Sequence, residues 1–352
     1  MIDLSIYGFN DRKYPGSMEG TIPARIMATH RERYNILCEK GEASAQLKAS
    51  VYYIDYTDEP YPTVGDFVLI RYNPLGESQI MKTLPRTSYF TRKDPDVGRG
   101  EQAVAANFDY VFLFTSLNED FNIKRLERYL AVARQSGAEP VIILTKADLT
   151  ENFTAILHQT EQVAMGTKIL IVSAKSGYGM KEAEAYLQPG KTIVCLGSSG
   201  VGKSSLINEL AGVEIMKVNT IREEDDKGRH TTTHRQLVLL SSGAMIIDTP
   251  GMRELGLWSA DAGLDEAFAD VEVYLGQCKF SDCTHQNEPD CAVRAALNRG
   301  DLSLDRWQRY LRLKEEVTYN EDKQKFMQQR KEWSKSIAKK SRQMKKANKI
   351  QK

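Results

Sequence analysis

One segment of the sequence has the residues and spacing of a phosphate-binding loop. It reads Gly197-Ser-Ser-Gly-Val-Gly-Lys-Ser204 and stands between an apolar stretch and a helical pattern. Glycines let successive backbone N–H groups wrap a phosphate, and the N-terminus of the following helix adds positive potential. The lysine would neutralise the β- and γ-phosphates, and the last serine hydroxyl would bind Mg²⁺. We therefore predict nucleotide contacts from Gly197, Ser198, Ser199, Gly200, Val201, Gly202, Lys203, Ser204 and Ser205.

Two later segments can complete a magnesium and γ-phosphate site. The motif Asp248-Thr-Pro-Gly251 follows the apolar residues 245–247. An aspartate at the end of such a strand suits a water-mediated contact to Mg²⁺, and the Gly251 N–H can reach the γ-phosphate. The polar loop 228–234 lies between the two motifs, and its Thr232 is the candidate for a second magnesium ligand.

Hydrolysis also needs a group that orients the attacking water. The residue after Gly251 is Met252, whose apolar side chain cannot do this, so we expect slow intrinsic turnover. His230, beside Thr232 in the same polar loop, is the candidate catalytic group, together with Thr232 and Lys203. A structural or RNA contact is the other interpretation of His230.

Two short motifs resemble the segments that read guanine. Thr145-Lys-Ala-Asp148 resembles the Asn-Lys-x-Asp box, whose aspartate pairs with N1 and the exocyclic amine of the base. Ser173-Ala-Lys175 resembles the loop whose N–H contacts the guanine O6. Each follows a predicted strand, at the carboxyl edge where α/β sheets bind ligands. Threonine in place of asparagine removes one amide contact, so we expect guanine selection to persist with weaker affinity. GTP and GDP are thus favoured over ATP, with Thr145, Lys146, Asp148, Ser173, Ala174 and Lys175 as base-reading residues.

A cluster of cysteines near the C-terminus has the spacing of a zinc site. Three of the five cysteines, Cys278, Cys283 and Cys291, fall within fourteen residues together with His285. A Cys3His set with short turns suits closed tetrahedral Zn²⁺, which leaves no open position for catalysis. We predict one structural zinc ion per chain.

The elements that would carry these motifs fall into three regions. Five short strands between about residues 20 and 85, with turn residues between them, predict a small barrel. An oligonucleotide-binding (OB) barrel is favoured, with an SH3-like barrel as the alternative. Residues 86–93 combine arginines with Tyr89 and Phe90, which suits either RNA stacking or a docked linker.

Strands and helices alternate from residue 109 to about residue 258, which predicts a parallel sheet covered on both faces. The order of the motifs is unusual, because both base-reading motifs precede the phosphate loop. The sheet is therefore circularly permuted relative to Ras-like GTPases, and the chain after Gly251 continues directly into the C-terminal region. Beyond that point we expect helices only, one of which begins after Ser303 and directs Leu304, Trp307 and Leu311 inward.

Charge is distributed unevenly along the chain. The formal net charge is +1, yet residues 306–352 hold 16 Lys and Arg against 5 Asp and Glu. Such a basic tail favours a polyanionic partner, although a solvated appendage is the alternative. No apolar run approaches the ~18 residues of a membrane span, and the N-terminus lacks a secretory pattern, so we expect neither membrane insertion nor secretion.

Together these features resemble the RsgA (YjeQ) family of circularly permuted GTPases. The resemblance rests on the permuted motifs, the zinc spacing, residues 101–109 and Gly228-Arg-His-Thr-Thr-Thr233. It implies a multidomain α/β chain: an OB barrel (1–85), a GTPase core (86–257) and a zinc-binding helical domain with a basic tail (258–352). It also implies a cytoplasmic, monomeric GTPase that binds the small ribosomal subunit and its rRNA and acts in late maturation of that subunit. Thr145 and the long tail depart from the family pattern.

Two other functions remain open on the sequence alone. The chain could be an RNA-binding assembly factor that uses GTP only as a conformational switch. It could also be a permuted GTPase that acts on the large subunit, although the N-terminal barrel and the zinc spacing argue against that.

Overall fold

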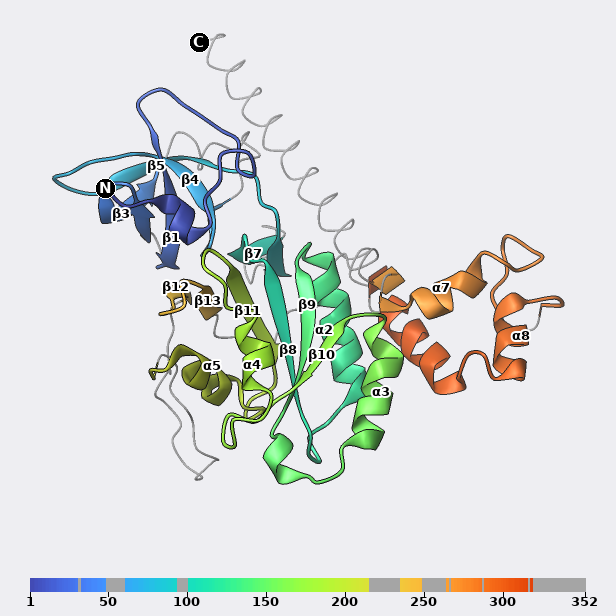
Figure 1. Ribbon diagram of the computed structural model, residues 1–352. Helices are drawn as coiled ribbons and strands as arrows, with labels where there is room; N and C mark the ends of the chain where they lie inside the picture. The colour runs from blue at the N-terminus through green and yellow to red at the C-terminus, as the bar shows by residue number, and fades with distance from the viewer. Residues whose placement is uncertain are drawn as a thin grey trace, which may run out of the picture.

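The computed structural model describes residues 1–30, 33–48, 61–93, 101–214, 235–248, 264–265, 267–286, 288–315 and 317–318. They form a barrel, a twisted sheet flanked by helices, and a helical region that projects to one side (Figure 1). His230, Thr232, Gly251 and the basic tail beyond residue 318 lie outside the described residues, as does the side chain of Asp248.

The N-terminal region is a closed five-stranded barrel. After the short 3₁₀ helix η1 (Leu4–Tyr7), its strands pair in the ring order β1-β2-β3-β5-β4, and β4 returns to β1. This is the order of an OB barrel, which confirms the favoured fold. Alternate apolar residues fill its interior, among them Ile26, Ile36 and Ile80. The strands are β1 (Ile22–Thr29), β2 (Tyr34–Cys38), β3 (Gly41–Leu47), β4 (Phe67–Arg71) and β5 (Ser78–Thr83).

The segment after the barrel is not an exposed linker. It forms β6 (Tyr89–Lys93), which pairs with β7 (Glu101–Ala106) in a hairpin. Phe90 is buried against Phe108, and Arg86 donates to the buried carboxylate of Asp66. Of the two interpretations of residues 86–93, RNA stacking is wrong for Arg86 and Phe90, and the docked segment is what the structure shows.

The central sheet has the order β10-β9-β8-β11-β13-β12. Its first five strands run parallel. The strand β12 pairs antiparallel with β13 on one side and with residues 28–29 of β1 on the other, so the sheet continues into the barrel. The strand β11 therefore lies in the middle of the sheet, where it delivers the phosphate loop. The strands are β8 (Tyr110–Ser116), β9 (Glu139–Thr145), β10 (Lys168–Ile171), β11 (Thr192–Gly197), β12 (Arg235–Leu239) and β13 (Met245–Asp248).

Alternating residues of these strands bury two separate cores. One core joins Leu113 and Ile142 to α2 and α3, and the other joins Phe112 and Ile143 to α4 and α5. Helices thus cover both faces (Figure 1), as the uninterrupted apolar runs of the strands require. The connecting elements are α2 (Ile123–Gln135), η2 (Ala147–Leu149), α3 (Thr154–Ala164), α4 (Met180–Glu184) and α5 (Lys203–Ala211).

The C-terminal region is helical, with α7 (Ala269–Leu275), α8 (Ala292–Arg299) and a helix over residues 304–315. Its apolar residues continue the core that lies over α2. Trp307 is buried as predicted, but Leu304 is 61% exposed and Leu311 is 38% exposed. The helix instead turns Arg306, Tyr310 and Leu313 inward.

A buried ion-pair cluster explains that orientation. Glu127 on α2 is 1% exposed, and its Oε1 accepts from Arg306 at 2.5 Å and from Arg309 at 2.9 Å. Arg306 also pairs with Asp270 of α7 at 2.8 Å and lies 3.8 Å from the ring centroid of Phe268. Removing one member of such a cluster would leave a buried charge without its partner, so the cluster fixes how the helical region packs on α2.

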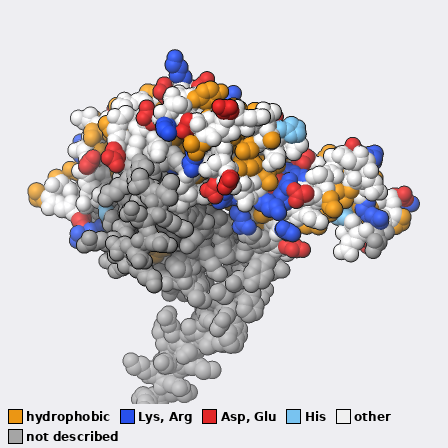
Figure 2. All heavy atoms as spheres, turned by 90° about the horizontal axis from the view of Figure 1, so that it is seen from below, with side chains coloured by type: hydrophobic (Ala, Val, Ile, Leu, Met, Phe, Trp, Pro, Cys, Tyr) orange, Lys and Arg blue, Asp and Glu red, His pale blue; other side chains and the backbone are white. Residues whose placement is uncertain are grey.

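The described surface mixes both signs of charge. On the face seen in Figure 2, Lys and Arg side chains alternate with Asp and Glu side chains over the body and the projecting helical region. Among the described residues, none of the helices combines the length and apolarity that a membrane span requires.

Candidate functional site

The phosphate loop connects β11 to α5 at the carboxyl edge of the sheet. Gly200 and Gly202 have φ of 73° and 98°, a backbone region that side-chain-bearing residues rarely adopt. A Cβ on Gly197 would lie 2.7 Å from Cβ of Phe114, so only glycine fits where the loop leaves β11. The loop then enters α5 at Lys203, which directs the N-terminus of that helix toward the loop.

The lysine of this loop folds back over it. Nζ of Lys203 donates to the carbonyl oxygens of Gly197 at 2.8 Å and Ser198 at 2.6 Å. The ammonium group is therefore held above the loop, where a nucleotide's β- and γ-phosphates would meet it. Ser204 follows in the first turn of α5 and is half-buried.

The two base-reading motifs meet at the ends of neighbouring strands β9 and β10. Oγ of Ser173 donates to Oδ1 of Asp148 at 2.6 Å, and the Ala147 N–H donates to the Val172 carbonyl at 3.2 Å. The Ser173 hydrogen bond holds the pKa of Asp148 below its usual range, so the carboxylate is ionised at neutral pH. An exposed, ionised carboxylate fixed in orientation can accept the two N–H groups on the guanine edge.

Thr145 connects the base-reading motif to the phosphate loop. Its buried hydroxyl donates to the carbonyl of Val201, inside the loop, at 2.6 Å, and the Thr115 carbonyl lies 3.3 Å from the same oxygen. The sequence predicted only the loss of an amide contact at this position. The structure shows that the threonine hydroxyl has its own partner, across the end of β8.

The magnesium and catalytic candidates are only partly described. Asp248 is the last residue of β13, the strand beside β11, so its backbone lies next to the strand that carries the phosphate loop. Thr232, Gly251 and His230 fall outside the described residues, and their roles remain predictions.

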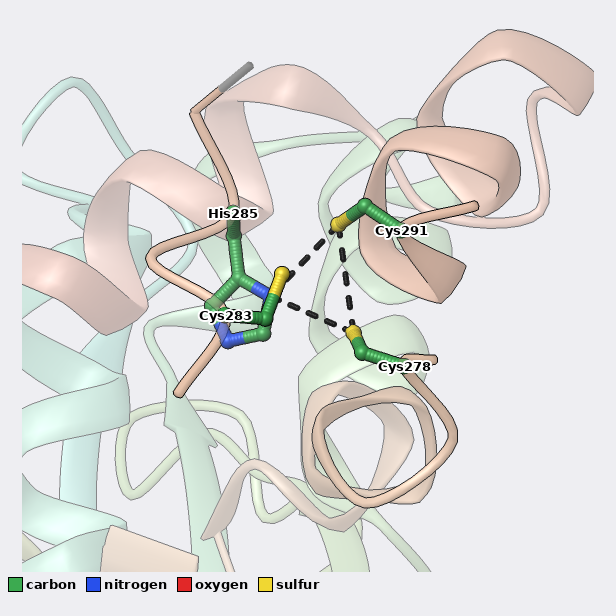
Figure 3. A group of neighbouring side chains, drawn as sticks. All are labelled: Cys278, Cys283, His285 and Cys291. Atoms are coloured by element: carbon green, nitrogen blue, oxygen red, sulfur yellow. Dashed lines mark hydrogen bonds between the residues drawn. The ribbon is translucent and has the colours of Figure 1, made fainter. Parts of the chain in front are cut away.

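The four zinc candidates come together in the C-terminal region (Figure 3). Their ligand atoms all lie within 4.8 Å of one another. Nδ1 of His285 is 3.5 Å from the sulfurs of both Cys278 and Cys291, and those sulfurs are 3.9 Å apart. Ligands about 2.3 Å (sulfur) and 2.1 Å (nitrogen) from a tetrahedral Zn²⁺ would be about 3.8 Å and 3.6 Å apart. The cluster therefore fits zinc.

Neighbouring groups fix the position of His285 and favour its neutral ring. The carboxylate of Glu288 accepts the N–H groups of Thr284 and Gln286, each at 2.9 Å, and so clamps the turn on either side of His285. His285 itself has φ of 62°, a costly conformation for a residue with a side chain. Burial lowers the pKa of His285, which favours the neutral ring that binds zinc. Trp307 packs edge-on against the same ring at 5.7 Å.

Comparison with known proteins decides the family. The RsgA GTPase family model matches residues 83–258, which contain the base-reading motifs, the phosphate loop and Asp248. The small ribosomal subunit biogenesis GTPase RsgA 1 of Listeria monocytogenes is 48% identical over 296 residues, 84% of each chain. This chain belongs to the RsgA GTPase family.

More distant RsgA relatives agree over the same extent. The small ribosomal subunit biogenesis GTPase RsgA of Opitutus terrae is 40% identical over 87% of this chain and 86% of its own. A crystal structure of YjeQ from Thermotoga maritima matches with a TM-score of 0.61 at 26% identity, over 83% of this chain and 97% of that one. A structure of YloQ, a circularly permuted GTPase, shares the fold at 23% identity and a TM-score of 0.57, over 87% of this chain and 96% of that one.

Thr145→Val should weaken GDP binding, because it leaves the Val201 carbonyl without its donor while keeping the side-chain volume. We expect a loss of about 3- to 10-fold in affinity, in line with one buried hydrogen bond. Thr145→Ser should restore most of the affinity, and Thr154→Val on the exposed start of α3 should have no effect. Titration with a fluorescent GDP analogue measures all three, and wild-type affinity in Thr145→Val would show that this bond does not order the site.

Zinc should be present at about one ion per chain, and Cys283→Ser should lower both the zinc content and the melting temperature of the C-terminal region. Structural zinc contributes directly to folding, and here it would fix His285 beside Trp307. Cys38→Ser in the barrel is the matched control and should retain zinc. Elemental analysis that finds no zinc in wild-type protein purified without chelators would contradict this site.

Proposed function

We propose that this chain binds GTP with Mg²⁺ at the carboxyl edge of its sheet and hydrolyses it to GDP and phosphate during late maturation of the small ribosomal subunit. The observation that carries the proposal is the meeting of three motifs at that edge. One hydrogen bond of 2.6 Å joins Ser173 to Asp148, and another of 2.6 Å joins Thr145 to Val201 of the phosphate loop. The relatives named for small-subunit biogenesis support the biological role.

The phosphates and the magnesium ion would be held mainly by α5 and the loop before it. The backbone of residues 197–205 would wrap the phosphates, and Lys203 would leave its two carbonyl partners to bind the β- and γ-oxygens. Ser204 and Thr232 would bind Mg²⁺, with Asp248 acting through a water molecule. Bound Mg²⁺ would neutralise charge that develops on the phosphate oxygens.

The base would be read by the other two motifs. Asp148 would accept N1–H and the exocyclic amine of guanine, while Ser173 keeps that carboxylate oriented. Lys146, Ala174 and Lys175 complete the walls around the base, and the N–H groups of residues 173–175 would favour a carbonyl at O6.

Turnover would depend on an added group, because Met252 cannot orient water. His230 is our candidate for that role, and contact with the ribosomal subunit would bring its loop to the γ-phosphate. Gly251 would sense the γ-phosphate through its N–H. The chain that follows Gly251 leads into the helical region docked on α2, so subunit contact and nucleotide state can influence each other.

Each of the three proposed domains has its own place relative to rRNA. The barrel (1–85) and the basic tail of the zinc-binding region (258–352) would contact rRNA, and the GTPase core (86–257) would lie between them. We propose a cytoplasmic monomer with one structural zinc ion.

The test is GTP turnover by the full chain, with and without purified small subunits and, in parallel, large subunits. We expect small subunits alone to raise turnover, on the order of 10-fold or more. Ser204→Ala should abolish most of it, about 100-fold, because a magnesium ligand is lost. Ser242→Ala, in an exposed turn, should behave as wild type.

Other outcomes would identify the alternatives. Stimulation by large subunits alone would assign the chain to that particle. Nucleotide-dependent binding to small subunits without any hydrolysis would make it an RNA-binding factor that uses GTP only as a switch.

A further inference from the structure

A polar cavity of about 310 Å³ lies at the junction of the barrel and the central sheet. One wall is the N-terminal segment that contains Gly8, Asn10 and Lys13, and the other is the turn 189–192 that opens β11. This is the amino end of β11, whereas the phosphate loop follows its carboxyl end. The cavity is therefore separate from the GTP site, and its volume is at the lower end of small-molecule sites, roughly 300–1,000 Å³.

The two walls meet through backbone, which fixes the shape of the cavity. A Cβ on Gly8 would lie 2.8 Å from the carbonyl oxygen of Gly190, so no side chain fits between them. Both glycines have positive φ, 79° and 77°. The close approach keeps the N-terminal segment against the start of β11 and leaves the cavity open beside it.

Arg25 of β1 lines this cavity as a buried cation. Its side chain is 1% exposed, and it donates to the Asn107 carbonyl at 3.0 Å, to Oγ1 of Thr192 at 2.9 Å and to the Tyr7 carbonyl. These oxygens are all uncharged, and within the described ranges Nε has no hydrogen-bond partner. Burial lowers the pKa of Arg25 to about 10, so the guanidinium stays charged at neutral pH. The carboxylates of Asp109 and Asp66 act on this charge without a hydrogen bond to it, and a buried charge that is bonded only to neutral groups is costly.

Two lysines add to the positive charge of the same cavity. Nζ of Lys191 lies 3.1 Å from Oδ1 of Asp109, and Nζ of Lys13 lies 3.8 Å from the same oxygen. Asp109 also accepts the Thr192 N–H at 2.9 Å. One carboxylate therefore faces three cations, Lys13, Lys191 and Arg25, and the lining carries an excess of two positive charges. Both lysine side chains are 43% exposed, so they can turn toward an incoming ligand.

We propose that this cavity binds a small phosphorylated molecule through a phosphate monoester. A monoester is close to doubly charged at neutral pH and would balance the excess charge, with Lys13 and Lys191 donating to its oxygens and Arg25 behind them. Hydroxyl and amide groups of Ser5 and Asn10 are available to the rest of the molecule. A phosphodiester of RNA carries a single charge, so it would balance the excess of two positive charges less well.

The bound molecule would tie the N-terminal segment to β11. That strand is short, so Thr192 in the cavity and Gly197 at the phosphate loop are its two ends. A ligand here would thus stabilise the docking of the barrel on the GTPase core without touching the nucleotide.

The test uses the full chain saturated with GDP and Mg²⁺, so that the phosphate loop is already filled. Inorganic phosphate and glucose 6-phosphate are the probes, and hydrogen exchange of residues 5–14 and 189–192 is the readout. We expect both probes to slow exchange in these two segments. The double variant Lys13→Gln/Lys191→Gln should weaken this protection by about 10-fold or more in probe concentration. The control Lys82→Gln/Lys168→Gln removes the same charge from exposed strand positions and should keep it.

Three results would overturn the proposal. Unchanged exchange at saturating probe would mean that the cavity binds no phosphate. Equal protection in the two double variants would reduce the effect to non-specific anion binding. Protection by an RNA oligonucleotide but by neither probe would assign the charge to the RNA backbone.

Discussion

The hydrogen bond from the Thr145 hydroxyl to the Val201 carbonyl joins the two halves of the proposed nucleotide site. It is possible only because β9, β8 and β11 are parallel and end at one edge, so that a base-reading motif and a phosphate loop about fifty residues apart meet. A purine nucleotide is rigid at its base and its phosphate contacts are fixed by backbone N–H groups, so the spacing between these parts decides whether both can bind at once. On the proposed function, guanine bound at Asp148 would place its phosphates for hydrolysis only when that spacing holds.

The permuted chain order connects this site directly to the C-terminal region, which a Ras-like order would not do. After β13 the chain enters the C-terminal region, whose helix 304–315 is held to α2 by the buried Glu127 with Arg306 and Arg309. The same helix places Trp307 against His285 of the zinc cluster. The Cys3His cluster, the ion pairs and the core over α2 are therefore parts of one packed unit. Displacement of that unit would change the packing on α2 of the GTPase core.

Much of this could be predicted from the sequence, because glycine, cysteine and charged motifs at fixed spacing have few structural solutions. The five-stranded barrel, the parallel strands and the Cys3His cluster were of this kind. The pairing of β6 with β7, the ion pair of Arg86 with Asp66, the burial of Phe90 and the exposure of Leu304 could not be predicted, since each depends on a distant partner. The buried position of Arg25 could have been predicted, because an arginine within the apolar strand β1 must find buried acceptors. The hydrogen bond of Thr145 could not have been predicted in this way, because its acceptor lies in another motif.

The most direct test of the central claim, that the permuted motifs build one guanine-specific site, is competition binding of GTP, xanthosine triphosphate and ATP to Asp148→Asn. An amide can accept only one of the two guanine N–H groups but can donate to the extra carbonyl of xanthine, while Ser173 still holds the position. We predict that the variant loses about 10-fold or more in GTP affinity and gains preference for the xanthine nucleotide. Asp120→Asn, on an exposed loop, should keep wild-type selectivity. Unchanged selection of GTP by Asp148→Asn would contradict the central claim.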